Sequence, residues 1–410
     1  NINMVNVIGL GYIGLPTALM LASHGVEVVG TDYNKELVES LNAGVPTFKE
    51  DGLDELFKNA VDAGIKFTNN YQHTDIYIVA VPTPYNKFSK KVDACYVKAA
   101  VNDVLDVCNA GATIIVESTV SPGTIDKEVR PLIAERGFIT GKDVHLVHAP
   151  ERILPGNMIY ELINNDRTIG ADEPKVADRV RDIYASFCKG EIVLTDIRTA
   201  EMTKVVENTF RAVNIAFANE LSRICRHDNM DVYEIIRICN KHPRVNIMNP
   251  GPGVGGHCIS VDPWFLVGDY PQLTKVIGES MKVNDSQPDF VLERLQVIMQ
   301  ENNIKDASRV GLYGITYKEN VDDYRDSPTL QLLESQARHL AAPLKCYDPF
   351  LENMKLTESQ YSDFDAFIND VDIVVVMVKH DHICHNWDRL KDKIVLDCHN
   401  ICPLPNTYRL

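Results

Sequence analysis

One cysteine of the chain follows a run of glycines that favours close contact between backbone and ligand. The segment Gly251–Cys258 contains four glycines, and glycine tolerates the tight turns that such contact requires. A helix is expected directly after Cys258, and a thiol at a helix start has more thiolate character than a free one. The segment therefore indicates a nucleophilic thiol. A buried structural cysteine is the alternative, and composition alone favours it.

A second set of reactive side chains lies on a helix predicted over residues 199–226. Lys204, Asn208 and Arg211 occupy positions i, i+4 and i+7, so they share one stripe of that helix. Because Lys, Asn and Arg are aligned on a helix that is otherwise rich in apolar residues, the stripe indicates the face of a functional site. A polar face in contact with water remains the alternative interpretation.

A glycine pattern near the start of the sequence predicts a dinucleotide site. Gly9, Gly11 and Gly14 form GxGxxG with Tyr12 and Ile13 between them, after an apolar strand and before a helix. These glycines permit a tight turn, close approach of a pyrophosphate and close helix packing. A turn that only packs the helix is the alternative.

The end of the next predicted strand indicates which dinucleotide binds. Asp32 lies there, where a carboxylate accepts hydrogen bonds from the adenosine ribose and repels a 2′-phosphate. We therefore expect NAD rather than NADP. Lys35 either assists at the ribose or is solvated. Thr83 and Thr119 follow two further strands and offer hydroxyls at the same sheet edge, although turn formation alone also explains them.

The elements that must position these residues alternate in type along the chain. Apolar strands are predicted at residues 5–9, 26–32, 76–81, 113–117 and 145–148, with helices between them, which is typical of a doubly wound parallel sheet. Helices are predicted from 199 to about 240 and from about 273 to 301. Strands return at 309–314, 344–348, 373–378 and 394–397. The fold class is α/β, with two Rossmann-like doubly wound domains (1–195 and 304–410) joined by a helical central domain (196–303).

Composition excludes several classes of partner. The 410 residues carry a net charge of −16, which argues against nucleic acid and against an anionic membrane surface. Ten scattered cysteines, with no signal peptide, favour a reduced, cytoplasmic protein. His380, His382, His385 and Cys384 lie close in sequence, but their spacing matches no known zinc pattern, so no metal is expected.

Six blocks, in order over nearly the whole chain, resemble the UDP-glucose/GDP-mannose dehydrogenase family. They are Gly9–Pro16, Glu117–Thr124, Ala149–Arg152, Glu201–Arg211, Gly255–Cys258 and Gly314–Lys318. The resemblance implies oxidation of a nucleotide-sugar C6 alcohol to a carboxylate with two NAD⁺. Cys258 would carry the thiohemiacetal and thioester.

The resemblance also implies roles for individual residues. Lys204 would shuttle a proton or stabilise the oxyanion, Asn208 would hold the same oxygen or the water, and Asp262 would orient the water. Glu151 would be a second acid or base, and Arg325 would approach the NAD⁺ pyrophosphate. The implied contacts of the nucleotide sugar are Glu151, Arg152, Ile153, Lys204, Asn208, Arg211, His242, Arg244, Gly255, Tyr317 and Lys318.

The identity of the sugar depends on the residues around the thiol. Family members that act on UDP-glucose usually carry a Lys-Asp pair after the nucleophile, whereas this chain has Ser260-Val-Asp262-Pro-Trp-Phe. The segment is most similar to members that act on UDP-N-acetyl-D-mannosamine. UDP-N-acetylglucosamine and UDP-glucose are alternative substrates, and a non-catalytic sensor of NAD or nucleotide sugars is the non-enzyme alternative. We expect a homo-oligomer, at least a dimer, with Arg244 reaching a neighbouring subunit.

Overall fold

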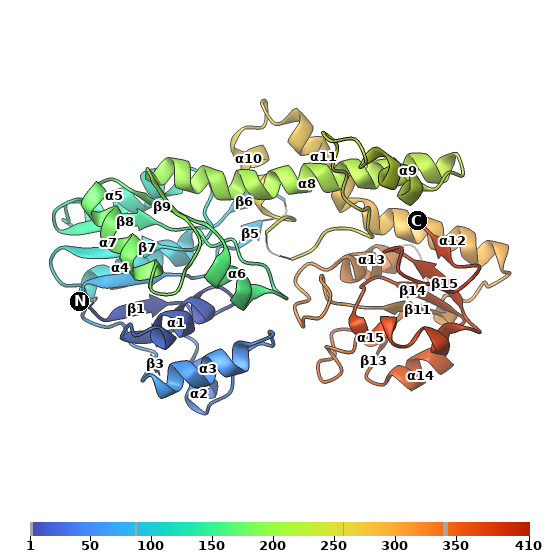
Figure 1. Cartoon of the computed structure of the whole chain (residues 1–410), viewed down its shortest axis with the longest axis horizontal. Coiled ribbons are helices and arrows are strands. Elements are labelled where there is room, and N and C mark those ends of the chain that lie inside the picture. Colours follow the sequence, from blue (N-terminus) through green and yellow to red (C-terminus); the bar gives the residue numbers. More distant parts are fainter. Residues whose placement is uncertain (1–2, 87, 257, 339–342) are drawn as a thin grey trace. The chain divides into compact units, whose positions relative to one another are not determined.

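Strands and helices alternate along the chain in the computed structural model, which describes residues 3–86, 88–256, 258–338 and 343–410 (Figure 1). The chain divides into two compact units, Asn1–Glu207 and Asn208–Leu410. No helix in the described ranges combines the length and the apolar character that crossing a bilayer demands. The three-domain division expected from the sequence stays a prediction.

The first unit is built on an eight-stranded sheet. Its strands are β1 (Val5–Ile8), β2 (Val28–Thr31), β3 (Lys66–Thr68), β4 (Ile76–Val79), β7 (Ala112–Val116), β8 (Val144–His148), β9 (Arg167–Ala171) and β10 (Ile192–Thr195). Their order is β10-β9-β8-β7-β4-β1-β2-β3. The expected parallel sheet needs one correction, because β9 runs antiparallel to β8. A short hairpin, β5 (Tyr85–Asn86) and β6 (Lys91–Val92), stands apart from the sheet.

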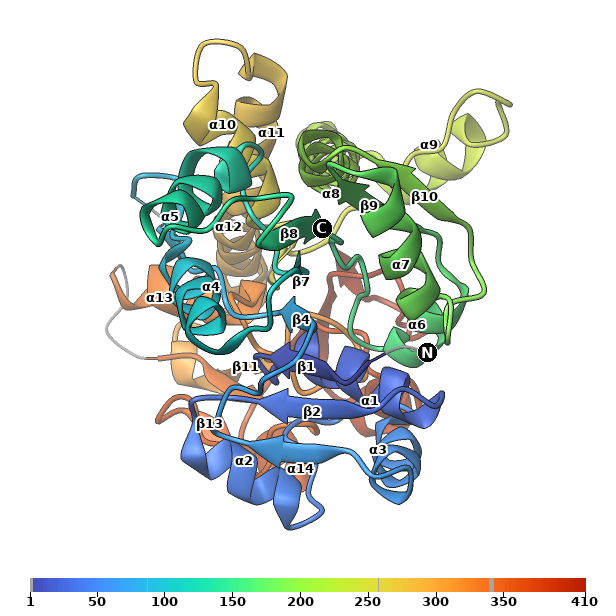
Figure 2. The same ribbon diagram turned by 90° about the vertical axis from the view of Figure 1, so that its left-hand side faces the viewer.

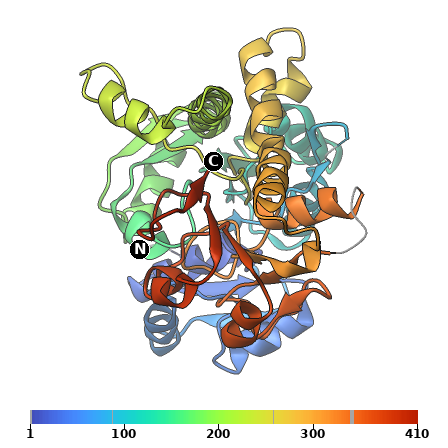
Figure 3. The same ribbon diagram turned by 90° about the vertical axis from the view of Figure 1, so that its right-hand side faces the viewer.

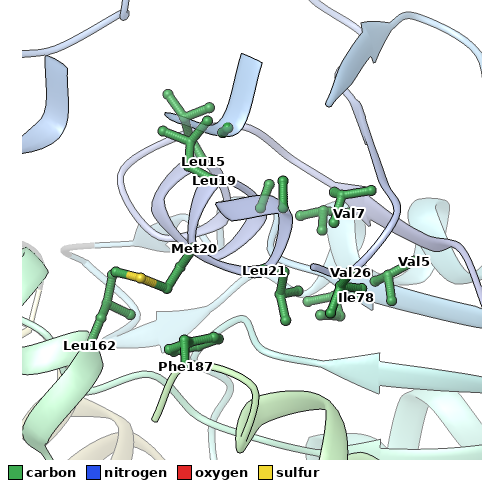
Figure 4. Close-up of a cluster of buried hydrophobic side chains, with 14 of the residues drawn as sticks. Val5, Val7, Leu15, Leu19, Met20, Leu21, Val26, Ile78, Leu162 and Phe187 are labelled. Carbon is green, nitrogen blue, oxygen red and sulfur yellow. The ribbon is translucent and has the colours of Figure 1, made fainter. Parts of the chain in front are cut away.

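Helices cover both faces of this sheet, as Figure 2 shows. They are α1 (Gly14–Ser23), α2 (Lys35–Asn42), α3 (Leu53–Asp62), α4 (Cys95–Val107), the π-helix η1 (Ile125–Val129), α5 (Arg130–Glu135), α6 (Met158–Asn164) and α7 (Pro174–Tyr184). One core packs α1, α2, α3, α6 and α7 on one face, and a second packs α4, η1 and α5 on the other. In Figure 4, Met20 of α1 reaches toward Leu162 of α6, which closes the first core.

The longest helix carries the predicted polar stripe. Helix α8 (Ile197–His227) has 31 residues and agrees with the expected helix over 199–226. The helical character expected to continue to about residue 240 is interrupted. Asn229 adopts a positive φ of 54°, and α9 (Val232–Cys239) restarts after Asp231, whose carboxylate accepts the Tyr233 and Glu234 amides.

The second helical segment is also divided. Residues 273–301 were expected as one helix but form α11 (Lys275–Asp285) and α12 (Gln287–Glu301), which meet at Ser286. Pro288 lies in the first turn of α12, where backbone N–H groups have no partner within the helix, so the missing N–H of proline costs no hydrogen bond. In the middle of one longer helix, the same proline would remove a backbone hydrogen bond. Helix α10 (Asp262–Asp269) precedes both.

The second unit carries a sheet of six parallel strands, which can be followed in Figure 3. The order is β13-β12-β11-β14-β15-β16, with bounds β11 (Val310–Tyr313), β12 (Lys345–Tyr347), β13 (Gln360–Tyr361), β14 (Ile373–Val376), β15 (Ile394–Asp397) and β16 (Tyr408–Arg409). One face packs α12 and α13 (Pro328–Ala337). The other packs α14 (Phe364–Asn369), α15 (Asp381–Cys384) and η3 (Trp387–Leu390). A 3-10 turn, η2 (Ala307–Arg309), precedes β11.

Candidate functional site

The glycine loop after β1 has the geometry that a pyrophosphate requires. Gly9 has a φ of 94°, and a Cβ there would lie 2.5 Å from the Ala80 carbonyl oxygen. A Cβ on Gly14 would lie 1.8 Å from the Gly9 carbonyl oxygen, so α1 packs directly on the turn. A Cβ on Gly11 would meet nothing within 4 Å, so this backbone is open for approach. Gly9 and Gly14 thus have the tight turn and the close helix packing expected of them, while the approach of a pyrophosphate to Gly11 stays a prediction.

Asp32 lies beside this loop, at the end of β2. Its carboxylate accepts hydrogen bonds from the Leu10 amide and the Asn34 amide, both at 2.9 Å. Tyr12 and Ile13 are half-buried, and the Tyr12 ring packs against Phe48 with centroids 4.5 Å apart. The loop and the carboxylate fit an adenosine ribose and a pyrophosphate, which are parts of NAD.

Thr83 and Thr119 follow β4 and β7, which are successive neighbours of β1 in the sheet. The chain reverses its strand order between β1 and β4, and ligands of doubly wound sheets bind at such a switch point. Thr83 is buried and Thr119 is half-buried. Lys35 is exposed at the start of α2.

The position of Asp32 predicts the choice of cofactor. We expect kcat/KM with NAD⁺ to exceed that with NADP⁺ by at least ~100-fold, because the added phosphate would face a carboxylate. Asp32→Ala should narrow this ratio, while Asp62→Ala, an exposed carboxylate on α3, should leave it unchanged. Steady-state rates with both cofactors measure the ratio, and equal efficiency in the unchanged protein would refute this role of Asp32.

The first unit also contains the candidate residues that follow β8. Glu151 is buried, and its carboxylate pairs with Arg167 and accepts the Arg152 amide at 2.9 Å. The Arg152 guanidinium pairs with Glu207 and donates to the Asp166 carbonyl. Ile153 is buried in the core. Lys204 of α8, which belongs to the same unit, is only 2% exposed.

In the second unit, hydrogen bonds join the backbone of Cys258 to two of its candidate partners. The Cys258 carbonyl accepts the Asp262 amide at 2.8 Å, one turn later. The Asp262 carboxylate is buried and accepts the Asn208 side-chain amide at 2.8 Å. The structure thus links Cys258, Asp262 and Asn208. The expected helix begins at Asp262 rather than directly after Cys258, which lies in the preceding turn.

The glycine segment before Cys258 packs on the loop that follows β11. A Cβ on Gly255 would lie 2.6 Å from the Asp326 carbonyl oxygen, and one on Gly256 would lie 2.8 Å from the Tyr317 ring. The Gly256 amide donates to the Arg325 carbonyl at 2.8 Å. These contacts explain why glycine occupies both positions, and they place Tyr317 beside the candidate thiol turn. His257 lies outside the described residues.

Other predicted ligand contacts are spread more widely in the second unit. Arg325 is held by buried Asp323, with a guanidinium-to-carboxylate distance of 2.6 Å. His242 and Arg244 are exposed on the loop after α9, where the His242 ring accepts the Arg244 amide at 3.2 Å. Arg211 and Lys318 are half-buried. The contact of His242 with the nucleotide sugar and the reach of Arg244 into a neighbouring subunit stay predictions.

The histidine-rich segment has a structural explanation. His380 is fully buried, with Nε2 3.0 Å from the Asp348 carboxylate and Nδ1 accepting the Asn320 amide at 2.9 Å. His382 lies 2.9 Å from the Tyr313 hydroxyl. Among the residues that the structure describes, no three His, Cys, Asp or Glu side chains are grouped to hold a metal ion.

Sequence reasoning missed the polar residues that support the candidate site. Glu117 and Tyr184 hydrogen bond in the interior at 2.6 Å, and Arg167 joins Glu151 nearby. Glu201 of α8 accepts the Ile125 amide at 3.4 Å, and burial raises the pKa of its carboxyl to about 7. The available signal was a carboxylate at the end of a buried strand (Glu117) or on an apolar helix face (Glu201).

Comparison with known families gives matches over three successive parts of the chain. Residues 3–188 match the NAD-binding domain of the UDP-glucose/GDP-mannose dehydrogenase family. Residues 198–286 match its central domain, and residues 311–403 match its UDP-binding domain. Together these matches cover most of the chain.

Individual relatives align over almost their full length. A UDP-N-acetyl-D-mannosamine dehydrogenase of Methanocaldococcus jannaschii is 40% identical over 96% of this chain and 92% of that protein. An NDP-N-acetyl-D-galactosaminuronic acid dehydrogenase of Ralstonia nicotianae is 38% identical over 96% of this chain and 95% of that protein. The solved UDP-N-acetyl-mannosamine dehydrogenase of Staphylococcus aureus is 37% identical, with a TM-score of 0.87 over 99% of this chain and 98% of that one.

Proposed function

Because the chain belongs to the UDP-glucose/GDP-mannose dehydrogenase family and is an NAD-dependent nucleotide-sugar dehydrogenase, we propose that it oxidises UDP-N-acetyl-D-mannosamine to the uronate. The observation that carries this substrate is the 40% identity, over 96% of the chain, to a dehydrogenase of that sugar. The departure from the UDP-glucose pattern after Cys258, with Ser260-Val-Asp262, supports it.

The proposed reaction is a four-electron oxidation at C6. When bound, NAD⁺ accepts a hydride in each of two oxidations. Lys204 shuttles the alcohol proton or stabilises the developing oxyanion while the aldehyde forms, and it lies buried at 2% exposure. The Cys258 thiolate then adds to the aldehyde carbon to give a thiohemiacetal, and the second oxidation leaves a thioester.

Hydrolysis of the thioester completes the proposed reaction. Water adds to the thioester carbon, the carbon–sulfur bond breaks, and the thiol and the carboxylate are released. Asp262 orients this water, and its hydrogen bond from Asn208 at 2.8 Å fixes the carboxylate for that role. Glu151 is a second base. Gly255, in the segment before Cys258, packs closely against the Tyr317 side chain.

A panel of nucleotide sugars tests the proposed substrate. UDP-N-acetylmannosamine, UDP-N-acetylglucosamine, UDP-N-acetylgalactosamine, UDP-glucose and GDP-mannose are each supplied with NAD⁺, and NADH absorbance is followed. The proposal requires the highest kcat/KM with UDP-N-acetylmannosamine. A higher value with UDP-N-acetylgalactosamine would favour the reaction named for the Ralstonia relative instead. NADH formation with none of the sugars would favour a sensor.

From the amino-acid composition, we also propose that the enzyme is cytoplasmic. We further propose that it is a homo-oligomer whose subunits are joined through α8. Side chains at helical spacing form an apolar stripe along α8, defined by Val206, Phe210, Val213, Phe217, Leu221 and Ile224. Phe210 is 67% exposed and Phe217 is 54% exposed. A row of large apolar side chains exposed on one helix is typical of a surface that a second subunit covers. Two-fold pairing is the commonest arrangement of identical subunits.

Charge on the apolar stripe should separate the subunits. We expect Phe210→Glu/Phe217→Glu to be monomeric in light scattering at sub-micromolar concentration and to lose at least ~10-fold in kcat/KM, since burying a charge in an interface is costly. Val61→Glu, on an exposed apolar residue of α3, is the matched control and should keep the mass of the unchanged protein.

Mixing two inactive variants tests whether Arg244 acts in a neighbouring subunit. Arg244→Ala and Cys258→Ser should each be impaired, and a mixed oligomer should regain one complete site. Recovery of activity on mixing supports the shared site. A fully active monomer of the unchanged protein would refute both the interface and the role of Arg244.

A further inference from the structure

One of the candidate catalytic groups, Glu151, belongs to a buried ion pair. Arg167, the first residue of β9, pairs with the carboxylate of Glu151, and both side chains are at least nine-tenths buried. The Arg167 guanidinium also lies over the Tyr184 ring, 4.5 Å from its centroid, and 5.3 Å from that of Phe187. The guanidinium is thus fixed between two aromatic rings on one side and Glu151 on the other.

A second carboxylate belongs to the same cluster. Glu117, at the end of β7, is fully buried and accepts hydrogen bonds from the Thr17 hydroxyl at 2.7 Å and the Tyr184 hydroxyl at 2.6 Å. Thr17 lies on α1, directly after the glycine loop, and Tyr184 ends α7. Glu117 is therefore hydrogen bonded both to α1, which begins at the glycine loop, and to Tyr184, whose ring packs against the Arg167 guanidinium.

The charges of this cluster do not balance when every group is ionised. Arg167 is a cation that acts on both carboxylates, the Tyr184 hydroxyl faces Glu117, and the Cys188 thiol acts on Arg167. Two carboxylates and one guanidinium leave one net negative charge in a dry interior, where an unpaired charge is expensive. Burial, then repulsion from Glu151, raises the pKa of Glu117 to about 7, while Arg167 opposes both effects.

The two carboxylates differ in their partners. Glu151 has the guanidinium and a backbone amide, both of which favour the ionised form. Glu117 has only two neutral hydroxyl donors. One retained proton is therefore more stable on Glu117 than on Glu151.

We propose that Arg167 and Glu117 are positioning residues, in which Arg167 keeps Glu151 ionised and oriented as a base while Glu117 holds the single proton that the carboxylate pair retains. The inference rests on the proposed function only for the use made of Glu151. The charge states themselves are properties of the folded protein without substrate. Neither residue touches the reacting atoms, since both act through Glu151.

The kinetic test compares two substitutions of Arg167. Without the cation the Glu151 carboxylate would be an unpaired buried charge, so the acidic limb of the kcat/KM profile of Arg167→Met should lie at least ~1 pH unit higher than that of the unchanged protein. Arg167→Lys keeps a cation and should restore the limb toward its original position. If kcat/KM of both variants were lower at every pH and the acidic limb stayed at its original pH, Arg167 would have only a structural role.

The second test uses thermal unfolding and needs no substrate. A carboxyl whose pKa is raised by folding keeps a proton that the unfolded chain has lost, so stability falls as pH rises from about 4.5 to about 7 and stays lower above it. Glu117→Gln removes this penalty. The Tm of Glu117→Gln, measured relative to the unchanged protein, should therefore increase between pH 5 and about pH 7 and level off above it.

A constant difference in Tm over this range would overturn the assignment of the proton to Glu117. Should Glu117→Gln not fold, Tyr184→Phe gives the same readout. It removes a hydrogen bond that stabilises the Glu117 carboxylate, so the fall in stability should move to higher pH. Arg167→Met should lose most stability at high pH, where Glu151 would be an unpaired buried charge.

The two tests separate this inference from the proposed function. If no nucleotide sugar is oxidised by the unchanged protein, the proposed function fails, yet the pH dependence of Tm still decides the charge states. If oxidation proceeds and the Tm differences are flat, the proposed function stands and this inference fails.

Discussion

Replacing Cys258 by serine should reduce production of the carboxylate by at least ~10³-fold while leaving nucleotide-sugar binding nearly unchanged. In the proposed mechanism the second oxidation acts on a hemiacetal formed on sulfur, and hydrolysis acts on the resulting thioester. A serine hydroxyl is far less ionised at neutral pH, and an ester is a poorer acyl donor. The substitution changes one atom on a half-buried side chain, so the fold should persist. The measurement is product formation by mass spectrometry beside substrate affinity by calorimetry.

A matched cysteine control makes this result specific. Cys384→Ser replaces an exposed thiol on α15, and activity should remain. If Cys258→Ser formed the carboxylate at the original rate, Cys258 would not be the nucleophile. If the same variant no longer bound the substrate, the result would instead indicate that Cys258 is needed for substrate binding.

Gly14→Ala should destroy the cofactor site through packing alone. A Cβ there would lie 1.8 Å from the Gly9 carbonyl oxygen, a backbone atom that cannot move without opening the turn. We expect a loss of at least ~3 kcal/mol of stability, which for units of this size is roughly a 10 °C fall in Tm, and no measurable NAD binding. Differential scanning calorimetry and NAD titration measure the two effects.

Two other glycines provide contrasting controls. Gly278→Ala, inside α11, meets nothing within 4 Å and should keep activity and retain or slightly raise Tm, because alanine favours the helix more than glycine does. Gly11→Ala also meets no protein atom, so its Tm should be preserved while KM for NAD⁺ rises, because its open side is where the pyrophosphate approaches. Equal stability of Gly14→Ala and Gly278→Ala would contradict the account of the loop.

The elements that the sequence predicted well have strong local signals. Strands β1, β4, β7, β14 and β15 are buried runs, and α8 has helical spacing over 31 residues. Among the missed strands, β3, β13 and β16 have only two or three residues, and β9 and β10 contain half-buried or exposed residues, so their pairing depends on neighbours rather than on their own composition. The antiparallel direction of β9 is likewise set by tertiary packing.

The candidate site shows the same division. Glycine at positions 9 and 14 could be explained from the GxGxxG pattern because backbone sterics require it there, and Asp32 from its place at the end of a predicted strand, where its carboxylate accepts the Leu10 amide. The pairing of Asn208 with Asp262 joins residues 54 apart in sequence, and spacing alone does not reveal it. The Glu117 and Arg167 cluster was missed because its members lie on separate elements and meet only in the folded interior.

The stoichiometry of the complete reaction tests the central claim most directly. A limiting amount of UDP-N-acetylmannosamine is converted with excess NAD⁺, and NADH is counted against the sugar consumed while the product mass is recorded. The account predicts two NADH for each sugar, with a product that has lost two hydrogens and gained one oxygen. One NADH for each sugar, with an aldehyde as the final product, would contradict the oxidation through Cys258.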